Sequence, residues 1–217
     1  MDELIEFIKR TNLDGLILTP PISDMKELVK SLQLEIPLCV VSPGLLTSNP
    51  LWVSSDDFKA SYDMTCHLIN QGHKNIGFIK GHKDHGATQH RLDGYLNALT
   101  DNNIKMDDRN ITEGDFSFDS GEIAAKELLK KKTPKITAIF ASNDAMAAGV
   151  MKAAHKAKIN IPDEVSLVGF DNSPTASQAW PSITTIGQPI KEMASYAAQI
   201  LIAVSYTHLR AHETKCY

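Results

Sequence analysis

Polar side chains follow three apolar runs of this sequence, and their types suit the binding of a small hydroxylated molecule. Asn143 and Asp144 come directly after "ITAIFAS", Asp171 and Asn172 follow "VSLVGF", and Ser42 follows "LCVV". Carboxylate, amide and hydroxyl groups supply the hydrogen-bond donors and acceptors that such a molecule needs. If the runs are neighbouring parallel strands, these residues lie at the edge of a sheet where ligands bind.

Asn143 and Asp144 also stand directly before a helical pattern, "AMAAGVMKAAHKAK". The N–H groups in the first turn of a helix need acceptors, and both Asn and Asp supply them. We expect Asp144 to cap this helix and Asn143 to face a ligand. The alternative is that both side chains only complete the turn.

Arg91 and several aromatic residues could complete such a site. Arg91 lies near the start of a predicted helix, and its guanidinium presents a forked donor that suits two adjacent hydroxyl groups. The alternative is an ordinary surface arginine. Phe116, Phe118 and Trp180 lie near predicted strand ends, where a ring could stack on the apolar face of a sugar, although Phe118 equally fits a hydrophobic staple with Ile123.

Metal and catalytic chemistry have weaker support. His82, His85 and His90 occur in "GHKDHGATQH", but no second cluster completes a metal site, so we favour a solvated loop and expect no metal or other cofactor. Glycine-rich phosphate loops and the G-x-S-x-G motif of hydrolases are absent. An enzyme would need Asp144 or Asp171 as a general base, and neither has a nucleophile or second carboxylate placed by the sequence to help it. We therefore predict that the protein is not an enzyme.

The composition of the chain argues against direct binding to DNA or to a membrane. The 217 residues are 42% hydrophobic and carry a net charge of −4, which provides no basic face for DNA or an anionic membrane. The apolar runs are too short to span a bilayer, and Met1 leads into a charged helical segment that does not resemble a signal peptide. Cys39, Cys66 and Cys216 lack paired or metal-like spacing, so we expect reduced thiols in the cytoplasm, with the first two in the core.

Short apolar runs alternate with helical patterns along almost the whole chain. This alternation predicts an α/β fold with doubly wound parallel sheets and right-handed crossovers, and the richness in Ile, Val and Leu predicts strands buried on both faces. Two capping boxes are predicted, Asp24 with Glu27 and Asp119 with Glu122. The predicted strands are 13–21, 36–43, 74–81, 110–116, 136–141 and 165–170, with a further run at 182–189, and the predicted helices are 23–34, 56–73, 87–104, 118–132, 145–158 and 190–203.

Several segments resemble the effector-binding core of LacI/GalR-type transcription regulators, whose fold is of the periplasmic-binding-protein-like type. The segments are "GHKNIGFIKG", "RLDGYLNAL", "TAIFASNDAMAAGVMKAAHKAKINIPDEVSLVGFDN" and "WPSITTIGQPIKEMA". The resemblance implies two α/β subdomains around a sugar cleft. They would comprise residues 1–55 with 187–203, an incomplete subdomain, and residues 56–186.

The resemblance also implies a set of ligand contacts. They fall on Arg91, Asn143, Asp171 and Gln188, with Phe116 at the aromatic position. Arg91 and Asp171 would bracket the sugar hydroxyls, Asn143 would complete the polar rim, and Phe116 would pack on the ring face. Many members of the family carry an Asp-Arg pair where this chain has Ser42 and Pro43, which leaves the contact from the first subdomain and the identity of the sugar open.

These features predict the sugar-sensing domain of a cytoplasmic LacI-type repressor. A sugar would bind one closure state of the cleft better than the other and shift the population between them. The partners expected are a small sugar, a second copy of the chain in a homodimer, and DNA only through an N-terminal helix-turn-helix absent from this chain; no membrane is expected. The alternative is a periplasmic sugar-binding protein of the same fold.

Residues 204–214, "VSYTHLRAHET", do not share the resemblance to these regulators. They are similar to the translation of a transposase adapter used in short-read library preparation. We expect the helix before them to end at Ala203 and residues 204–217 to form a non-native tail that packs on nothing. Cys216 would then be an accidental thiol.

Overall fold

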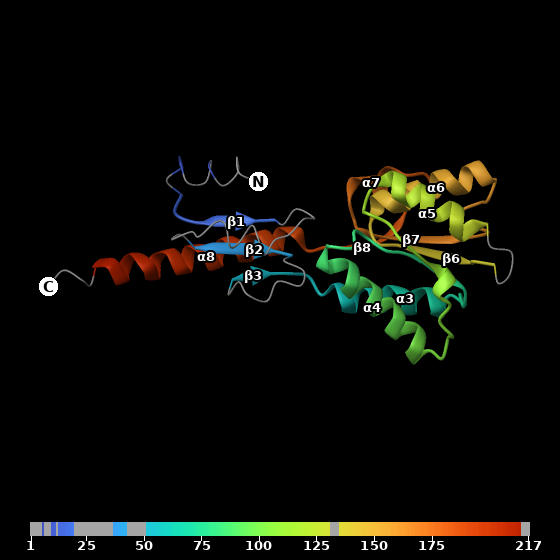
Figure 1. The fold of residues 1–217 in the computed structure, drawn as a ribbon, viewed down its shortest axis with the longest axis horizontal. Coiled ribbons are helices and arrows are strands. Elements are labelled where there is room, and N and C mark those ends of the chain that lie inside the picture. Colours follow the sequence, from blue (N-terminus) through green and yellow to red (C-terminus); the bar gives the residue numbers. More distant parts are fainter. Residues whose placement is uncertain are drawn as a thin grey trace. The chain divides into compact units, whose positions relative to one another are not determined.

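The structure of this chain, a computed structural model, describes residues 6, 10–11, 13–19, 37–42, 51–130 and 135–213, with side chains of the last helix described as far as Ser205. It consists of two compact units, Met1–Ser55 with Pro189–Tyr217, and Asp56–Gln188 (Figure 1). The second boundary lies two residues beyond the predicted one, and the tail from residue 204 belongs to the first unit.

The second unit is built on a parallel sheet with strand order β5-β4-β6-β7-β8. The side chains of β4 and β6 are buried throughout, as expected for strands covered on both faces. Because all five strands are parallel, their carboxyl ends meet at the same edge. The strands are β4 Ile76–Ile79, β5 Ile111–Thr112, β6 Ala138–Ala141, β7 Ser166–Asp171 and β8 Thr184–Gly187.

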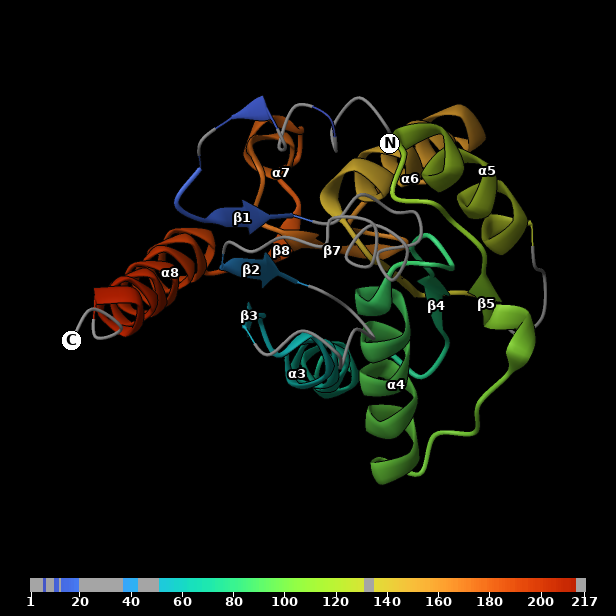
Figure 2. The ribbon, with the colours of Figure 1, turned by 60° about the vertical axis from the view of Figure 1, so that its left-hand side comes forward.

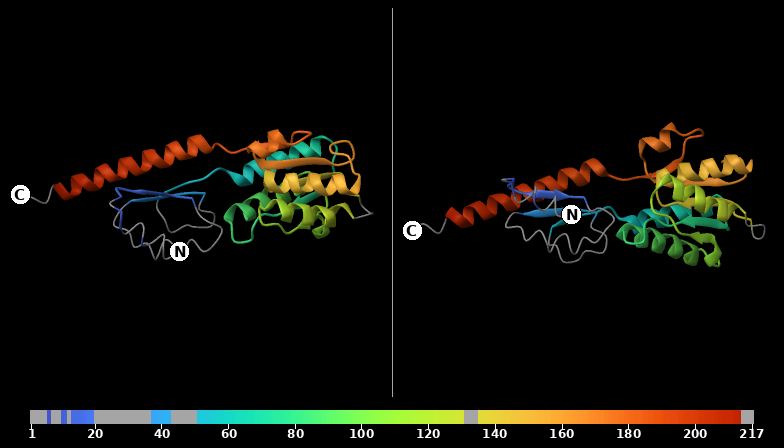
Figure 3. Two further views of the ribbon diagram at one scale, coloured as in Figure 1. Left: turned by 90° about the horizontal axis from the view of Figure 1, so that it is seen from above. Right: turned by 45° about the horizontal axis from the view of Figure 1, so that its top comes forward.

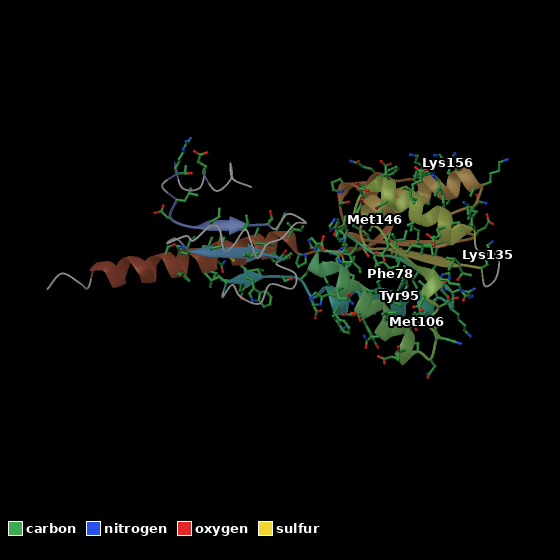
Figure 4. All side chains as sticks on the ribbon, viewed as in Figure 1. Phe78, Tyr95, Met106, Lys135, Met146 and Lys156 are labelled. Carbon is green, nitrogen blue, oxygen red and sulfur yellow. The ribbon has the colours of Figure 1, made fainter. Side chains whose placement is uncertain are left out.

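Two layers of helices cover this sheet. Helices α3 (Asp57–Asn70) and α4 (Gly86–Asp101) lie on one face, and α5 (Phe118–Leu129), α6 (Asp144–Ala157) and α7 (Pro174–Gln178) lie on the other (Figure 1). A short 3-10 helix, η1 (Asp108–Asn110), precedes β5. The ring of Tyr95 on α4 stacks on the ring of Phe78 on β4 with centroids 4.8 Å apart (both residues are labelled in Figure 4). The doubly wound α/β fold predicted from the alternation of strands and helices is confirmed.

The capping box predicted for α5 is wrong, although the helix begins at residue 118 as predicted. The N-cap of α5 is Ser117, whose hydroxyl accepts a hydrogen bond from the Ser120 N–H at 3.2 Å, so Asp119 and Glu122 do not form a capping box. The nearly buried Glu122 carboxylate faces three lysines instead, and these hold its pKa below its usual range. Their Nζ atoms lie 2.7–2.8 Å from its oxygens, and they are Lys126, Lys152 and Lys156 (Lys156 is labelled in Figure 4).

The first unit contains a three-stranded parallel sheet and one long helix. The strands are β1 (Leu16–Leu18), β2 (Leu38–Val41) and β3 (Trp52–Val53) in that order, and α8 (Ile190–Glu213) packs against all three (Figures 2 and 3). Cys39 is in the small core of this unit, whereas Cys66 on α3 is only half-buried. The predicted helix 23–34 with its capping box, and Cys216, lie outside the described residues.

The prediction that the last helix ends at Ala203 is also wrong. Helix α8 continues to Glu213. Residues 204–213 include neither Gly nor Pro, so nothing in the local sequence stops the helix. The Ser205 hydroxyl lies within hydrogen-bonding distance of the carbonyl oxygens of Asp14 (3.2 Å) and Leu201 (2.9 Å), which share its single proton. The expectation that the tail packs on nothing therefore fails at this residue. Its adapter origin stays a prediction.

Glycines let the helices on each face of the second unit approach closely. A Cβ at Gly149 of α6 would overlap the backbone carbonyl oxygen of Phe118 on α5, and a Cβ at Gly121 would overlap the backbone of Met146. On the other face, a Cβ at Gly94 of α4 would overlap the Phe58 carbonyl oxygen of α3. These contacts set the distance between the helices of each pair.

We predict that Gly149→Ala destabilises the chain by about 1–3 kcal/mol, because the added methyl group must push α5 away from α6. The matched control is Gly187→Ala, whose Cβ would make only an ordinary contact with Asn172 at 3.7 Å. Urea denaturation followed by circular dichroism measures both. Equal stabilities of the two variants would contradict the close packing of α5 on α6.

Candidate functional site

Arg91 is the most constrained side chain at the carboxyl edge of the second sheet. It lies on the second turn of α4 and is 4% exposed. Its Nε donates to the Asp57 carboxylate at 2.8 Å, and its Nη1 donates to the Ser142 carbonyl oxygen. The guanidinium carbon lies 3.6 Å from the centre of the Phe170 ring. Arg91 is therefore a buried cation held through Nε, Nη1 and the face of its guanidinium, and the alternative of an ordinary surface arginine is excluded.

Asp171 and Gln188 lie side by side because β7 and β8 are parallel neighbours. Asp171 is the last residue of β7 and pairs with Gly187, which directly precedes Gln188. Gln188 Nε2 donates to Asp171 Oδ1 at 2.6 Å, and Arg91 Nη1 lies 3.9 Å from the same oxygen. Burial raises the pKa of the Asp171 carboxyl, although Arg91 and Gln188 act in the opposite direction.

The residue that caps α6 is Asn143, not Asp144. Asn143 has the extended backbone of an N-cap, and its Oδ1 accepts from the Met146 N–H at 2.9 Å. Asp144 is the first residue of α6 and is fully buried, so the prediction that it caps the helix is wrong. Asn143 also donates through Nδ2 to the Phe116 carbonyl oxygen at 3.0 Å, and it remains at the edge of the sheet where a ligand could meet it.

Phe116 reaches this edge from the segment between β5 and α5. Its φ is 70°, and its ring occupies the space that a side chain at Gly81 would need. The Arg91 guanidinium carbon lies 5.9 Å from the centre of the ring, and the His85 ring meets it edge-on with centroids 5.4 Å apart. The aromatic residue expected near Arg91 is therefore beside it.

His85 is the N-cap of α4. Its Nδ1 accepts a hydrogen bond from the Ala87 N–H at 3.3 Å, so the ring must be neutral with its proton on Nε2. Burial, and then the charge of Arg91, lower the pKa of this imidazole; Asp57 acts in the opposite direction and His82 in the same one. Among the described residues, no three His, Cys, Asp or Glu side chains gather as a metal site would require.

The structure brings the five predicted ligand residues into one set of contacts. Arg91 approaches Asp171 and Phe116, Asp171 is bonded to Gln188, and Asn143 is bonded to Phe116. The sequence argument missed Asp57, Phe170 and His85. His85 was considered only as a metal ligand; it lies two residues before the predicted helix 87–104 and directly before α4, which begins at Gly86.

Two other residues considered for ligand binding, Ser42 and Trp180, are not part of the contacts around Arg91. Ser42 follows β2 in the first unit, where its N–H donates to the Val53 carbonyl oxygen at 2.7 Å. Trp180 follows α7 in the second unit and is 93% exposed. No described contact joins Trp180 to the set around Arg91.

Known proteins share this fold and much of this sequence. A family model described as a periplasmic binding protein-like domain matches residues 65–215. The HTH-type transcriptional regulator DegA of Bacillus subtilis (strain 168) is 34% identical over 191 residues, which cover 87% of this chain and 56% of DegA. The chain thus spans a little over half the length of that relative.

Two solved structures are closely similar. The transcriptional regulator CelR–cellobiose complex has a TM-score of 0.86 at 28% identity, covering 95% of this chain and 64% of that chain. A regulatory protein of the LacI family from Chloroflexus aggregans has a TM-score of 0.85 at 25% identity, covering 94% and 73% of the two chains.

We predict that the stability of the folded chain falls in mild acid because of His85. A lowered pKa means that the unfolded chain takes up the proton first, so stability decreases as the pH falls below about 6.5 and levels off below the folded-state pKa. His85→Asn should lose the part of this dependence that His85 causes, since Asn caps a helix without titrating. Burial also lowers the pKa of His73, and its contribution should stay the same in the parent chain and the variant.

Urea denaturation at about pH 7.5 and about pH 5 measures how much stability the parent chain and His85→Asn each lose in acid. The difference between these two losses is set by the pKa shift of the His85 imidazole. His90→Asn, which removes an exposed histidine of the same helix, is the control and should behave as the parent chain. If His85→Asn loses as much stability in acid as the parent, the cap assignment is wrong.

Proposed function

The chain belongs to the periplasmic binding protein-like domain family and corresponds to the effector-binding core of LacI/GalR-type regulators, and from this membership we propose that it binds a neutral mono- or disaccharide as its effector. The single observation that carries the proposal is the buried Arg91 held beside Asp171, Gln188 and Phe116 at the carboxyl edge of one parallel sheet. This is the edge where ligands bind to such sheets.

Free hydrogen-bonding positions on these side chains support a hydroxylated ligand. Among the described residues, none bonds to Arg91 Nη2, Asp171 Oδ2 or Gln188 Oε1. A guanidinium N–H pair beside a carboxylate oxygen matches a hydroxyl group, which both donates and accepts. The Phe116 ring close to Arg91 supplies an apolar surface for the face of a sugar ring.

The charges around Arg91 favour a neutral ligand over a phosphorylated one. The guanidinium is already paired with Asp57 at 2.8 Å, and the Asp171 carboxylate lies nearby. One cation beside two carboxylates offers no excess positive charge for a phosphate group, which favours clusters of arginine.

For the whole protein we propose sugar-dependent control of transcription. The effector would bind one conformation better than another and shift the population between them. DNA would be bound by a part of the protein outside this chain, whose net charge of −4 does not favour DNA. Because a regulator must meet DNA, we propose a cytoplasmic location; none of the described helices is long and apolar enough to cross a membrane.

The rival functions have less support. Relatives such as DegA and the HTH-type transcriptional repressor PurR of Vibrio atlanticus (strain LGP32) are transcription regulators, which favours a regulator over a periplasmic sugar-binding protein. Asp144, one of the two carboxylates weighed as a general base, is fully buried and already accepts hydrogen bonds from Ser173 and Thr185. We propose that the chain has no catalytic activity.

We predict that Asp171→Asn and Arg91→Ala each weaken sugar binding by about 2–4 kcal/mol, because a polar partner is left unpaired in the bound state. Isothermal titration calorimetry with glucose, galactose, ribose, maltose and cellobiose measures the affinities. Arg109→Ala, which removes an exposed arginine of the same unit, is the control and should bind as the parent chain does. Unchanged affinity in both site variants would reject this site, and tighter binding of glucose 6-phosphate would reject the neutral effector.

We also propose that the protein forms a homodimer, as the family membership implies, through the face of the second unit that carries α5. Phe118 and Ile123 on this helix are exposed apolar side chains. We predict that Phe118→Lys weakens self-association, measured by sedimentation equilibrium. Phe58→Lys is the matched control, since Phe58 and Phe118 are both 37% exposed and their helices cover opposite faces of the sheet. A monomer at all concentrations, or equal effects of the two variants, would contradict this interface.

A further inference from the structure

The backbone where β7 ends is unusual. Asp171 and Asn172 are consecutive non-glycine residues with φ of 115° and 54°. Such conformations cost about 1–3 kcal/mol each and persist only where the surroundings impose them. The neighbours of Asp171 must therefore hold this segment.

Asp144 supplies that hold from the first turn of α6. Its carboxylate is fully buried; Oδ2 accepts from the Ser173 N–H at 2.7 Å, and Oδ1 accepts from the Thr185 hydroxyl at 2.5 Å. A Cβ at Gly169 would overlap Oδ1, so the backbone of β7 runs directly against the carboxylate. Asp144 thus joins α6, β7, β8 and the segment after β7 at one point.

Thr185 extends this hold to Asn172. Its Oγ1 donates to Asp144 and, through its lone pair, accepts from the Asn172 N–H at 3.3 Å. The two residues that follow Asp171 are therefore both fixed, Asn172 through Thr185 and Ser173 directly. We propose that Asp144, acting through Thr185, is a positioning residue that aims the Asp171 carboxylate at the effector.

A carboxylate is the group that this position requires. Asp144 receives two donors, and an Asn at the same place would turn an NH₂ group toward one of them. The partial positive charge at the start of α6 favours an anion there. This explains why two polar residues follow β6: Asn143 caps the helix, and Asp144 reaches across to the next strand end.

Loss of the contacts made by Asp144 and Thr185 would change the polar contacts of Asp171. With the present backbone, Asp171 Oδ1 lies 2.6 Å from Gln188 Nε2 and 3.9 Å from Arg91 Nη1. Release of Asn172 and Ser173 would let Asp171 leave its positive φ, which changes the direction of its side chain. The inference rests on the proposed function in one respect, namely that the Asp171 carboxylate contacts the effector.

The test is Thr185→Val, which keeps the shape of the side chain and removes only the hydroxyl. Thr184→Val, an exposed neighbour on the same strand, is the matched control. In the ligand-free chain, ¹³C NMR of the Asp171 carboxyl should show a changed titration in Thr185→Val and an unchanged one in Thr184→Val. The dissociation constant of the sugar that binds the parent chain should rise about tenfold in Thr185→Val, as expected for one lost hydrogen bond to a charged group.

A double-mutant cycle separates positioning from general destabilisation. In an Asp171→Asn background, Thr185→Val should weaken binding less than about twofold, because the group that it positions is already changed. An equal loss in both backgrounds, or an Asp171 titration that matches the Thr184→Val control, overturns the proposal. If no sugar of the panel binds the parent chain, the proposed function fails, and the ligand-free titration still decides whether Asp144 and Thr185 position Asp171.

Discussion

The arrangement of helices and strand ends in the second unit depends on the partners of one buried positive charge, that of Arg91. An isolated guanidinium in a protein interior is strongly unfavourable, and removal of the partner of a buried ion pair costs several kcal/mol. Arg91 is held by Asp57 from the start of α3, by the Ser142 carbonyl oxygen at the end of β6, and by the Phe170 ring on β7. Its pairing therefore fixes α3, α4 and two strand ends relative to one another.

The same edge of the sheet contains the starts of the helices that follow β4 and β6. His85 caps α4 and Asn143 caps α6. The residues that accept hydrogen bonds from the first-turn N–H groups of these helices are therefore also residues of the candidate site. The close contacts at Gly94, Gly121 and Gly149 set the distances between these helices and their neighbours. Side chains of the candidate site are thus oriented by structural hydrogen bonds before any ligand arrives, and such preorganisation reduces the entropic cost of binding.

The candidate site combines rigid and strained parts. Arg91 is buried and held on three sides, whereas Asp171 is partly exposed and stands on a left-handed backbone beside Asn172. Backbone strain of this kind is retained where a side chain must point in an otherwise unfavourable direction. One guanidinium beside two carboxylates leaves no excess positive charge, which is why we propose a neutral ligand. The ligand would bind at this edge because the carboxyl ends of the parallel strands lie there.

The sequence alone predicted most of the strands and helices in their order, because the burial pattern of a strand and the spacing of a helix are local properties. It missed β3 and α7, whose two and five residues are too few to show such a pattern. It also indicated that Arg91, Phe116, Asn143, Asp171 and Gln188 could share one edge, since the carboxyl ends of parallel strands meet there, although ligand contact by these residues stays a proposal. The tertiary structure decided which of two adjacent polar residues caps α6, because only Asp144 reaches Ser173 and Thr185. It likewise decided that Glu122 faces lysines rather than the start of α5, and that Arg91 pairs with Asp57, 34 residues away. Local patterns cannot rank such competing partners, because the choice depends on charges and burial that exist only after distant segments pack together.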